Sequence, residues 1–325
     1  MIDFRYHLVS IVSIFLALAV GIVLGAGPLQ GELGDTLSNE VAGLRQDKAE
    51  LNEQLSQAAA GTEARESYIA ETNPLVLAGA LAGQRVAVVV LPGADTAVVE
   101  STPASLASAG ATVVSTTTVA DTWVGTDEAV VAARDTAVRE AASSAGIDVS
   151  DSGSVSPRDV LLAALLSRPA ADATDAVAPQ AARTALETLA EADLLDVATE
   201  EFEIADLVVV VAGTSSQGDV EAQTTGADRW VDLTIALDAR ASGSVVAGEA
   251  STVEDGVDVL ASVRNDETAR EGVSTVDNAG SALGQASIVH GLVEQRAGEV
   301  GQYGLAEGAD AAYAPVPVFV PAPAP

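Results

Sequence analysis

The sequence has no cysteine among its 325 residues, a single methionine, Met1, and two histidines, His7 and His290. The lack of cysteine excludes disulfides, thiolate zinc sites, iron–sulfur clusters and cysteine nucleophiles. Soft metal ions prefer thiolate, thioether or imidazole ligands, so the chain has few groups that would hold them. Carboxylates are plentiful, and these suit hard cations such as Ca²⁺ or Mg²⁺. We therefore expect no tightly bound cofactor.

Basic residues are also scarce, because 15 Lys and Arg stand against 47 Asp and Glu and give a formal net charge of -32. This charge excludes a general nucleic-acid binder, since phosphates would repel the chain. Hydrophobic residues make up 48% of the chain and charged residues only 19%, so it is not a disordered polyanion. A sizeable core can be buried, and the length suggests roughly two structural units.

Residues 8–29, LVSIVSIFLALAVGIVLGAGPL, contain no charged side chain. A helix rising about 1.5 Å per residue would make this run long enough to cross a hydrocarbon core of about 30 Å. A buried core helix is disfavoured because a run that is apolar on all faces would need partners on every side. A cleaved signal peptide has a shorter apolar region, of about 7 to 15 residues, and a small-residue cleavage site, whereas Pro28 follows Gly27 here. We predict an uncleaved membrane anchor over residues 1–30.

The charges beside this span predict its orientation. Arg5 and the amino terminus precede the span, and Glu32 and Asp35 follow it. Positive flanks stay on the cytoplasmic side, so we expect a single-pass protein with a cytoplasmic N-terminus. The rest of the chain would then lie outside the cytoplasm, in the cell envelope.

Small residues recur every four positions in the span, at Ala17, Gly21 and Gly25. Such a strip lets two helix backbones approach closely and is typical of paired membrane helices. Gly and Ala are also common in membrane helices that do not pair, so this alternative stays open.

The segment after the span carries an apolar repeat. Leu37, Leu44 and Leu51 are seven residues apart, and Val41 and Leu55 fill alternate positions four residues after the first and third. This a/d seam of nearly three heptads predicts a coiled-coil connector helix within residues 31–73. A single amphipathic helix lying on its own domain would show a similar pattern. Together with the small-residue strip, the seam favours a parallel homodimer or a higher homo-oligomer.

Residues 74–304 alternate short Val-rich runs with helical stretches. Continuous apolar strands between helices are typical of a parallel sheet covered on both faces. We predict an α/β domain with an open, mostly parallel sheet of flavodoxin or Rossmann type. The expected strands are 85–91, 112–118, 207–212, 244–247 and 273–276, and the main expected helices are 126–144, 157–167, 181–192, 219–239, 253–263 and 279–297.

Residues 305–325 form a tail that ends in APVPVFVPAPAP. Proline at this density favours an extended polyproline II conformation and excludes a place inside a sheet. A disordered tail is the simpler interpretation, and a reach toward an envelope protein partner is the alternative.

The ends of the predicted strands lack the usual catalytic and cofactor motifs. No G-x-G-x-x-G follows any strand, and the loop from Gly213 to Gly218 carries Asp219 and Val220 where a phosphate loop needs Lys and Ser/Thr. Gln217 occupies the place of the second glycine of a G-x-S-x-G nucleophile elbow. We therefore predict no catalytic and no cofactor-binding residues, and no enzyme activity.

The serines and titratable groups have ordinary structural interpretations. Ser215 and Ser216 are expected to be turn residues that cap the next helix, and His290 to be a partly buried structural histidine. The acids gather in two clusters, Glu200, Glu201 and Glu203, and Glu254, Asp255 and Asp258. Such clusters are more often solvated helix starts than metal sites, so the metal ligands remain unknown.

Several ordered segments resemble one protein family. They are HLVSIVSIFLALAVGIVLGAGPLQGEL, GQRVAVVVLPGAD, LVVVVAGTSSQGD, VSTVDN and ALGQASIVHGLVEQRAGEVGQYG. Together with the heptad helix they resemble the actinobacterial, MctB-like copper transport protein family over nearly the whole chain. The resemblance implies an envelope-associated protein with one N-terminal hydrophobic helix and a role in copper export or homeostasis that limits intracellular copper.

The residues themselves do not provide a copper site, because thiolates, thioethers and imidazoles are almost absent. Copper would then be a transported ion held transiently by carboxylates, a passenger through an assembled pore, or a metal affected indirectly through a partner. The alternative function is a non-catalytic envelope scaffold or interaction module with an α/β head.

Overall fold

The computed structural model describes residues 4–25, 29–149, 155–168, 177–198, 202–250 and 256–317. The chain divides into two compact units, Met1–Arg65 and Glu66–Pro325. We call the second unit the head.

The first unit contains the long apolar helix that the sequence predicts. α1 runs from Phe4 to Gly25, and none of its residues is buried. Among the described residues it is the one helix long and apolar enough to cross a membrane. α2 follows from Leu29 to Val76 as one helix of 48 residues, so the segment expected to be a connector is helical, while its pairing with a second helix stays a prediction.

The head is built on a seven-stranded sheet with the order β3-β2-β1-β4-β6-β8-β9. All neighbouring strands are parallel except β2 and β3, which are antiparallel. The mixed α/β fold with a mostly parallel open sheet is therefore confirmed. The strands are β1 Arg85–Val90, β2 Thr112–Val119, β3 Leu195–Val197, β4 Leu207–Val211, β6 Ser244–Ala247, β8 Ser274–Val276 and β9 Gln302–Tyr303.

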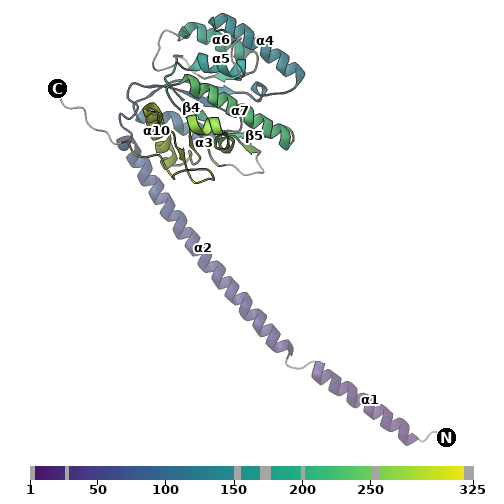
Figure 1. The fold of residues 1–325 in the computed structure, drawn as a ribbon. Helices are drawn as coiled ribbons and strands as arrows, with labels where there is room; N and C mark the ends of the chain where they lie inside the picture. Colours follow the sequence, from purple (N-terminus) through teal and green to yellow (C-terminus); the bar gives the residue numbers. More distant parts are fainter. Residues whose placement is uncertain are drawn as a thin grey trace. The chain divides into compact units, whose positions relative to one another are not determined.

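Helices flank the sheet (Figure 1). They are α3 Thr96–Ser108, α4 Glu128–Ala145, α5 Pro157–Leu166, α6 Pro179–Glu191, α7 Val220–Arg240, α8 Val259–Asn265, α9 Glu267–Gly272 and α10 Ala282–Ala297. A 3₁₀ turn, η1 Asp121–Trp123, follows β2, and the short strands β5 Thr214–Ser215 and β7 Val257–Asp258 form a separate antiparallel pair.

Side chains of the central strands alternate between two cores, because successive residues of a strand point to opposite faces. Ala87 and Val89 of β1 belong to a cluster formed with α4 to α9. Val86, Val88 and Val90 belong to a second cluster formed with α3 and α10. Both faces of β1 are therefore covered, which explains its continuous apolar sequence.

Local signals place the ends of several helices. Asp95 accepts hydrogen bonds from the amides of Ala97 (2.8 Å) and Val98 (3.3 Å) and so caps α3. Gly146 ends α4 with a left-handed φ of 68°. The helix expected at 253–263 starts only at Val259, because Asp258 caps it, and residues 253–255 lie outside the described part of the chain.

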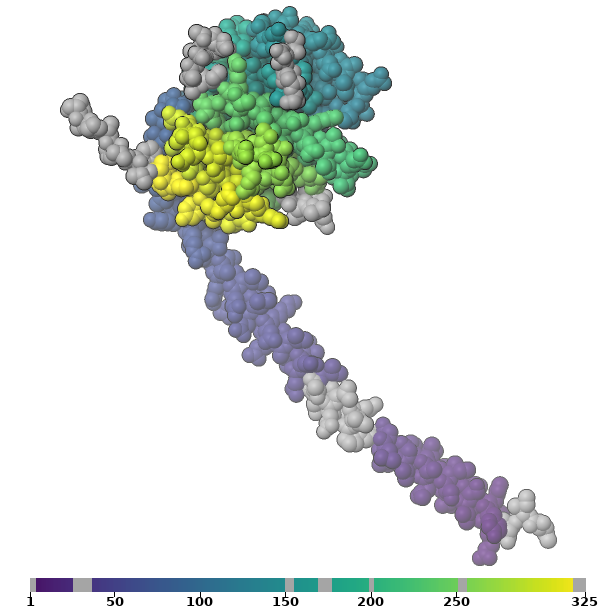
Figure 2. Space-filling model, viewed as in Figure 1, coloured from purple at the N-terminus to yellow at the C-terminus, as the bar shows by residue number. Residues whose placement is uncertain are grey.

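Residues 305–317 pack on the head beside α8, α9 and α10, within the yellow part of Figure 2. Arg270 of α9 pairs with Asp310 at 2.8 Å. Ala314 is buried, and its amide donates to the hydroxyl of Ser287 on α10 at 3.3 Å. The proline-rich end, residues 318–325, lies outside the described residues.

Candidate functional site

The carboxyl edge of the sheet is the first place to look for a site. The chain passes from β1 to β2 on one side, whereas β4 continues to β6 on the other. Ligands of open α/β sheets bind where the strand order reverses in this way. The loops after β1 and β4 would therefore form any nucleotide crevice.

These two loops are in contact with each other. A Cβ on Gly213 would overlap the backbone of Pro92, Gly93 and Ala94, and one on Gly93, whose φ is 72°, would lie 2.8 Å from the Thr214 hydroxyl. Glycine is therefore required at both positions for the loops to cross. The first loop therefore lies directly against Gly213, which leaves no room for a side chain at this position.

A small cavity of about 430 Å³ lies beside the crossing loops and contains two carboxylates among its lining residues, Asp95 and Glu249. Asp95 caps α3, and Glu249 accepts a hydrogen bond from the amide of Gly280. Both carboxylates therefore already stabilise local backbone structure.

A larger cleft, of about 870 Å³, lies between the start of α7 and the segment from η1 to α4. We call it the acidic cleft, because Asp121, Asp127, Asp219 and Glu221 line it against one basic residue, Arg229. A cleft lined by one sign of charge raises the local concentration of counter-ions. It offers oxygen ligands only, which hold hard cations better than soft ones.

The loop before α7 corrects one sequence expectation. Ser215 and Ser216 do not cap this helix: Ser215 lies in β5, and Asp219 is the cap, accepting from the amide of Ala222 at 3.0 Å. A cap must directly precede the first helical residue; Asp219 does so, whereas the two serines lie four and five residues before the start of α7.

The described residues contain no group of three or more His, Cys, Asp or Glu side chains placed to hold a metal ion. Of the two acidic clusters noted in the sequence, Glu200, Glu201, Glu254 and Asp255 lie outside the described residues. Asp258 caps α8. Glu203 lies 3.7 Å from the guanidinium of Arg85.

His290 is buried on α10, as expected of a structural histidine. Burial lowers its pKa, and a hydrogen bond with the backbone of Ala314 opposes this change. The other histidine, His7, is exposed on α1. The two imidazoles thus lie in different units of the chain.

The residues predicted to pair two chains are exposed. An added Cβ would meet no atom within 4 Å at Gly21 or Gly25, and Ala17 on the same helix is exposed. The seam residues of α2 are likewise exposed: Leu37, Val41, Leu44, Leu51 and Leu55. Their role in pairing remains a prediction.

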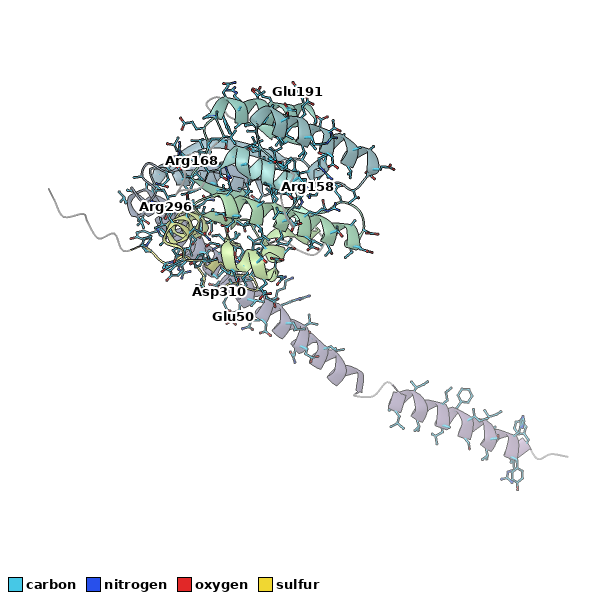
Figure 3. The ribbon with its side chains drawn as sticks, turned by 45° about the horizontal axis from the view of Figure 1, so that its top comes forward. Glu50, Arg158, Arg168, Glu191, Arg296 and Asp310 are labelled. Carbon is cyan, nitrogen blue, oxygen red and sulfur yellow. The ribbon has the colours of Figure 1, made fainter. Side chains whose placement is uncertain are left out.

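A buried polar centre that the sequence does not reveal joins Trp123, the last residue of η1, to α5. The indole of Trp123 donates to Asp159 at 2.8 Å, and both side chains are fully buried. The guanidinium of Arg158 approaches the same carboxylate at 3.3 Å; Arg158 stands at the start of α5 and Arg168 just beyond its end in Figure 3. Burial raises the pKa of Asp159 to about 6, against the charge of Arg158 and the hydrogen bond from Trp123.

Asp159 makes the stability of the head depend on pH. Because its folded pKa is about 6 and its ordinary value is 3.8, the folded state binds more protons between these values. Stability from this group therefore rises as pH falls through 6. We expect Asp159→Asn to remove this pH dependence, because Asn does not titrate. The change in the free energy of unfolding caused by the substitution should therefore be about 1 kcal/mol more favourable at pH 7.5 than at pH 5.

Denaturant unfolding of wild type and variant at the two pH values measures this difference. His290 is present in both proteins, so its own titration cancels. The exposed Asp196 of β3 provides the matched control, Asp196→Asn. An effect of Asp159→Asn that is equal at both pH values would contradict the raised pKa.

A second buried polar group, an ion pair, lies near the edge of the sheet formed by β8 and β9. Arg264 of α8 and Asp277, just after β8, are 3% and 2% exposed, and their closest atoms are 2.6 Å apart. Arg264 also donates to the carbonyl of Tyr303 at 2.7 Å, and Asp277 accepts from the amides of Leu305 (2.7 Å) and Ala306 (2.9 Å). The pair thus fixes the segment after β9 onto the sheet.

Comparison with known proteins identifies the family. The family model described as "Copper transport outer membrane protein, MctB" matches residues 1–314. The chain belongs to the MctB family. Proteins named "Copper transporter MctB" from Mycobacterium bovis and from two strains of Mycobacterium tuberculosis are each 28% identical over 316 residues, covering 95% of this chain and 98% of the relative.

Four of the five segments that carry the MctB resemblance lie in the head. LPGAD and AGTSS are the two crossing loops at the reversal of strand order. VSTVDN contains β8 and Asp277, and GQYG contains β9, so they meet at the buried ion pair. The MctB-like sequence pattern therefore marks the carboxyl edge of the sheet and the attachment of the C-terminal segment.

Proposed function

We propose that this chain is an envelope protein, anchored by α1, that lowers intracellular copper by export. The observation that carries the proposal is membership of a copper transport family over residues 1–314, which includes both the apolar helix and the head. The names of the mycobacterial relatives supply the substrate, copper. In this proposal the head has no catalytic role.

The charge distribution supports a head outside the cytoplasm. Of the 47 acids only Asp3 precedes α1, so nearly all of the negative charge belongs to the part that would face outward. Arg5 lies at the other end of the span, on the side that retains positive charge. An acidic head would concentrate cations near the membrane, and this effect would weaken as ionic strength rises.

Copper would be cargo and not a resident cofactor. In this proposal the carboxylates that line the acidic cleft attract copper ions by their charge and do not form a dedicated copper site. One membrane helix also cannot enclose a path for an ion. Transport would therefore need several copies of the chain or a partner that forms the path.

Copper content of a deletion strain tests the proposal. Cells lacking the chain should contain more copper than wild-type cells after growth in added copper, measured by mass spectrometry. The same cells carrying a copy with a C-terminal tag should return to the wild-type value, and protease should remove the tag from spheroplasts. Unchanged copper in the deletion strain would contradict the export role, and a protected tag would contradict the orientation.

A further inference from the structure

Beyond the predicted membrane span, one face of α2 carries a row of exposed apolar side chains. The five apolar seam residues, Leu37, Val41, Leu44, Leu51 and Leu55, are between 44% and 66% exposed. Large apolar side chains at this exposure in a regular row mark an interaction surface. An isolated helix also gains little stability in water without a packed apolar face.

The head contacts α2 beyond the seam. The carboxylate of Glu66 accepts from the amide of Ala282 at 2.8 Å, and the side chain of Asn73 donates to the carbonyl of the same residue at 2.7 Å. These contacts attach the last turns of α2 to the start of α10. The row from residue 37 to residue 55 precedes these contacts in the sequence and belongs to the first unit, where its apolar side chains are exposed.

We infer that residues 37–58 of α2 pair with the same residues of a second copy of this chain in a parallel, in-register, two-stranded coiled coil. In the heptad register, Leu37, Leu44 and Leu51 occupy d positions, and the a positions hold the β-branched Val41, followed by Lys48 and Leu55. Leu at d with a β-branched residue at a favours two strands.

The charged residues beside the seam also favour pairing with a second copy of the chain. Glu40 falls at a g position and Arg45 at the following e position. In a parallel in-register pair, g of one helix faces e of the other five residues on, so Glu40 of each copy faces Arg45 of the other. The next such pair, Asp47 and Asn52, brings no like charges together.

Lys48 falls at an a position in the middle of the seam. A single polar residue at a lowers stability but fixes register and the number of strands. A shift of one heptad would place Lys48 of one copy beside an apolar residue of the other. In register, the two lysines lie opposite each other, and each can extend toward Asp47 at the neighbouring g position.

Cysteine crosslinking tests the proposal without background, because the chain has no cysteine of its own. The full chain with Leu51→Cys should form disulfide-linked dimers under a mild oxidant in native membranes, since d positions of two paired helices face each other. Glu50→Cys, at the neighbouring outward c position, is the matched control and should crosslink far less. Equal crosslinking at both positions, or none at Leu51→Cys, would overturn the paired seam.

Register and partner are tested in the same way. Co-expressed chains carrying Leu44→Cys and Leu51→Cys should give homodimers but no mixed dimer, whereas a mixed product would contradict the register. A crosslinked band with the mass of a different protein would show that another partner occupies the seam, and would overturn the proposal.

Charge reversal provides an independent measurement. Glu40→Arg should weaken dimerisation of the detergent-solubilised full chain about tenfold, because two attractive pairs become repulsive. Adding Arg45→Glu should restore it. Sedimentation that shows no change with Glu40→Arg, or no rescue by the second substitution, would contradict the predicted pairing.

Discussion

Replacing Asp277 by Asn is expected to lower the free energy of unfolding of the head by about 3 to 5 kcal/mol, because the charge of Arg264 would remain buried without a counter-charge. Arg264 is 3% exposed, so water cannot replace the lost carboxylate. The amide of Asn also has one acceptor oxygen where Asp277 uses two, for Arg264, Leu305 and Ala306. The segment after β9 should therefore loosen.

The matched control for this variant is Asp310→Asn. Asp310 pairs with Arg270 at 2.8 Å and fixes the same C-terminal segment, but the two side chains are 57% and 40% exposed. An exposed pair contributes about 0 to 1 kcal/mol, so the control should change stability little. Fluorescence during denaturant unfolding measures both variants, because Trp123 and Trp230, the two tryptophans, are both buried in the head.

The double variant Arg264→Met with Asp277→Leu separates two interpretations. If the cost of Asp277→Asn comes from an unpaired charge, the double variant should be more stable than either single change, since a buried ion pair can be replaced by apolar side chains. Equal loss in the single variant and in Asp310→Asn would contradict the importance of burial at this pair.

The central strands could be predicted from sequence because they are covered on both faces. The runs 86–90 and 207–211 contain only Val, Ala and Leu, and they lie side by side in the sheet, with Val88 opposite Val209. Asp95 and Gly146 were equally predictable, since a carboxylate before a helix and a glycine after one act within a few residues.

The edge strands could not be predicted, because distant contacts stabilise them. β9 consists of Gln302 and Tyr303, which do not form an apolar run. Gln302 is 1% exposed because its side chain bonds Thr275 at 2.7 Å and the carbonyl of Val273 at 3.0 Å. β3 has only three residues, with an exposed Asp196 in the middle.

The buried polar groups were also hidden from the sequence. Asp159 is an acid in the first turn of a helix, a position where an exposed carboxylate would be favoured by the helix dipole. Its partner Trp123 is 36 residues away. The sequence offered one indication of this centre. The chain has only two tryptophans, both are buried, and a buried indole N–H needs a hydrogen-bond acceptor such as a carboxylate.

Removal of the membrane anchor α1 is expected to abolish the effect of the chain on cellular copper. An acidic head acts on cations only within about a Debye length of its surface, roughly 8 to 10 Å at physiological salt. A head released from the membrane would therefore lose its influence at the membrane surface, and it would also lose any path formed with neighbouring membrane helices. We expect the function to require α1 and the head in one chain.

Cellular copper in a complemented deletion strain tests this account most directly. One strain carries the full chain, and the other carries residues 31–325 exported behind a cleavable signal peptide, with both levels matched by immunoblot. We predict that the full chain restores the wild-type copper content and that the unanchored head leaves copper at the higher level of the deletion strain. Equal copper in the two strains would contradict a membrane-anchored copper transport protein.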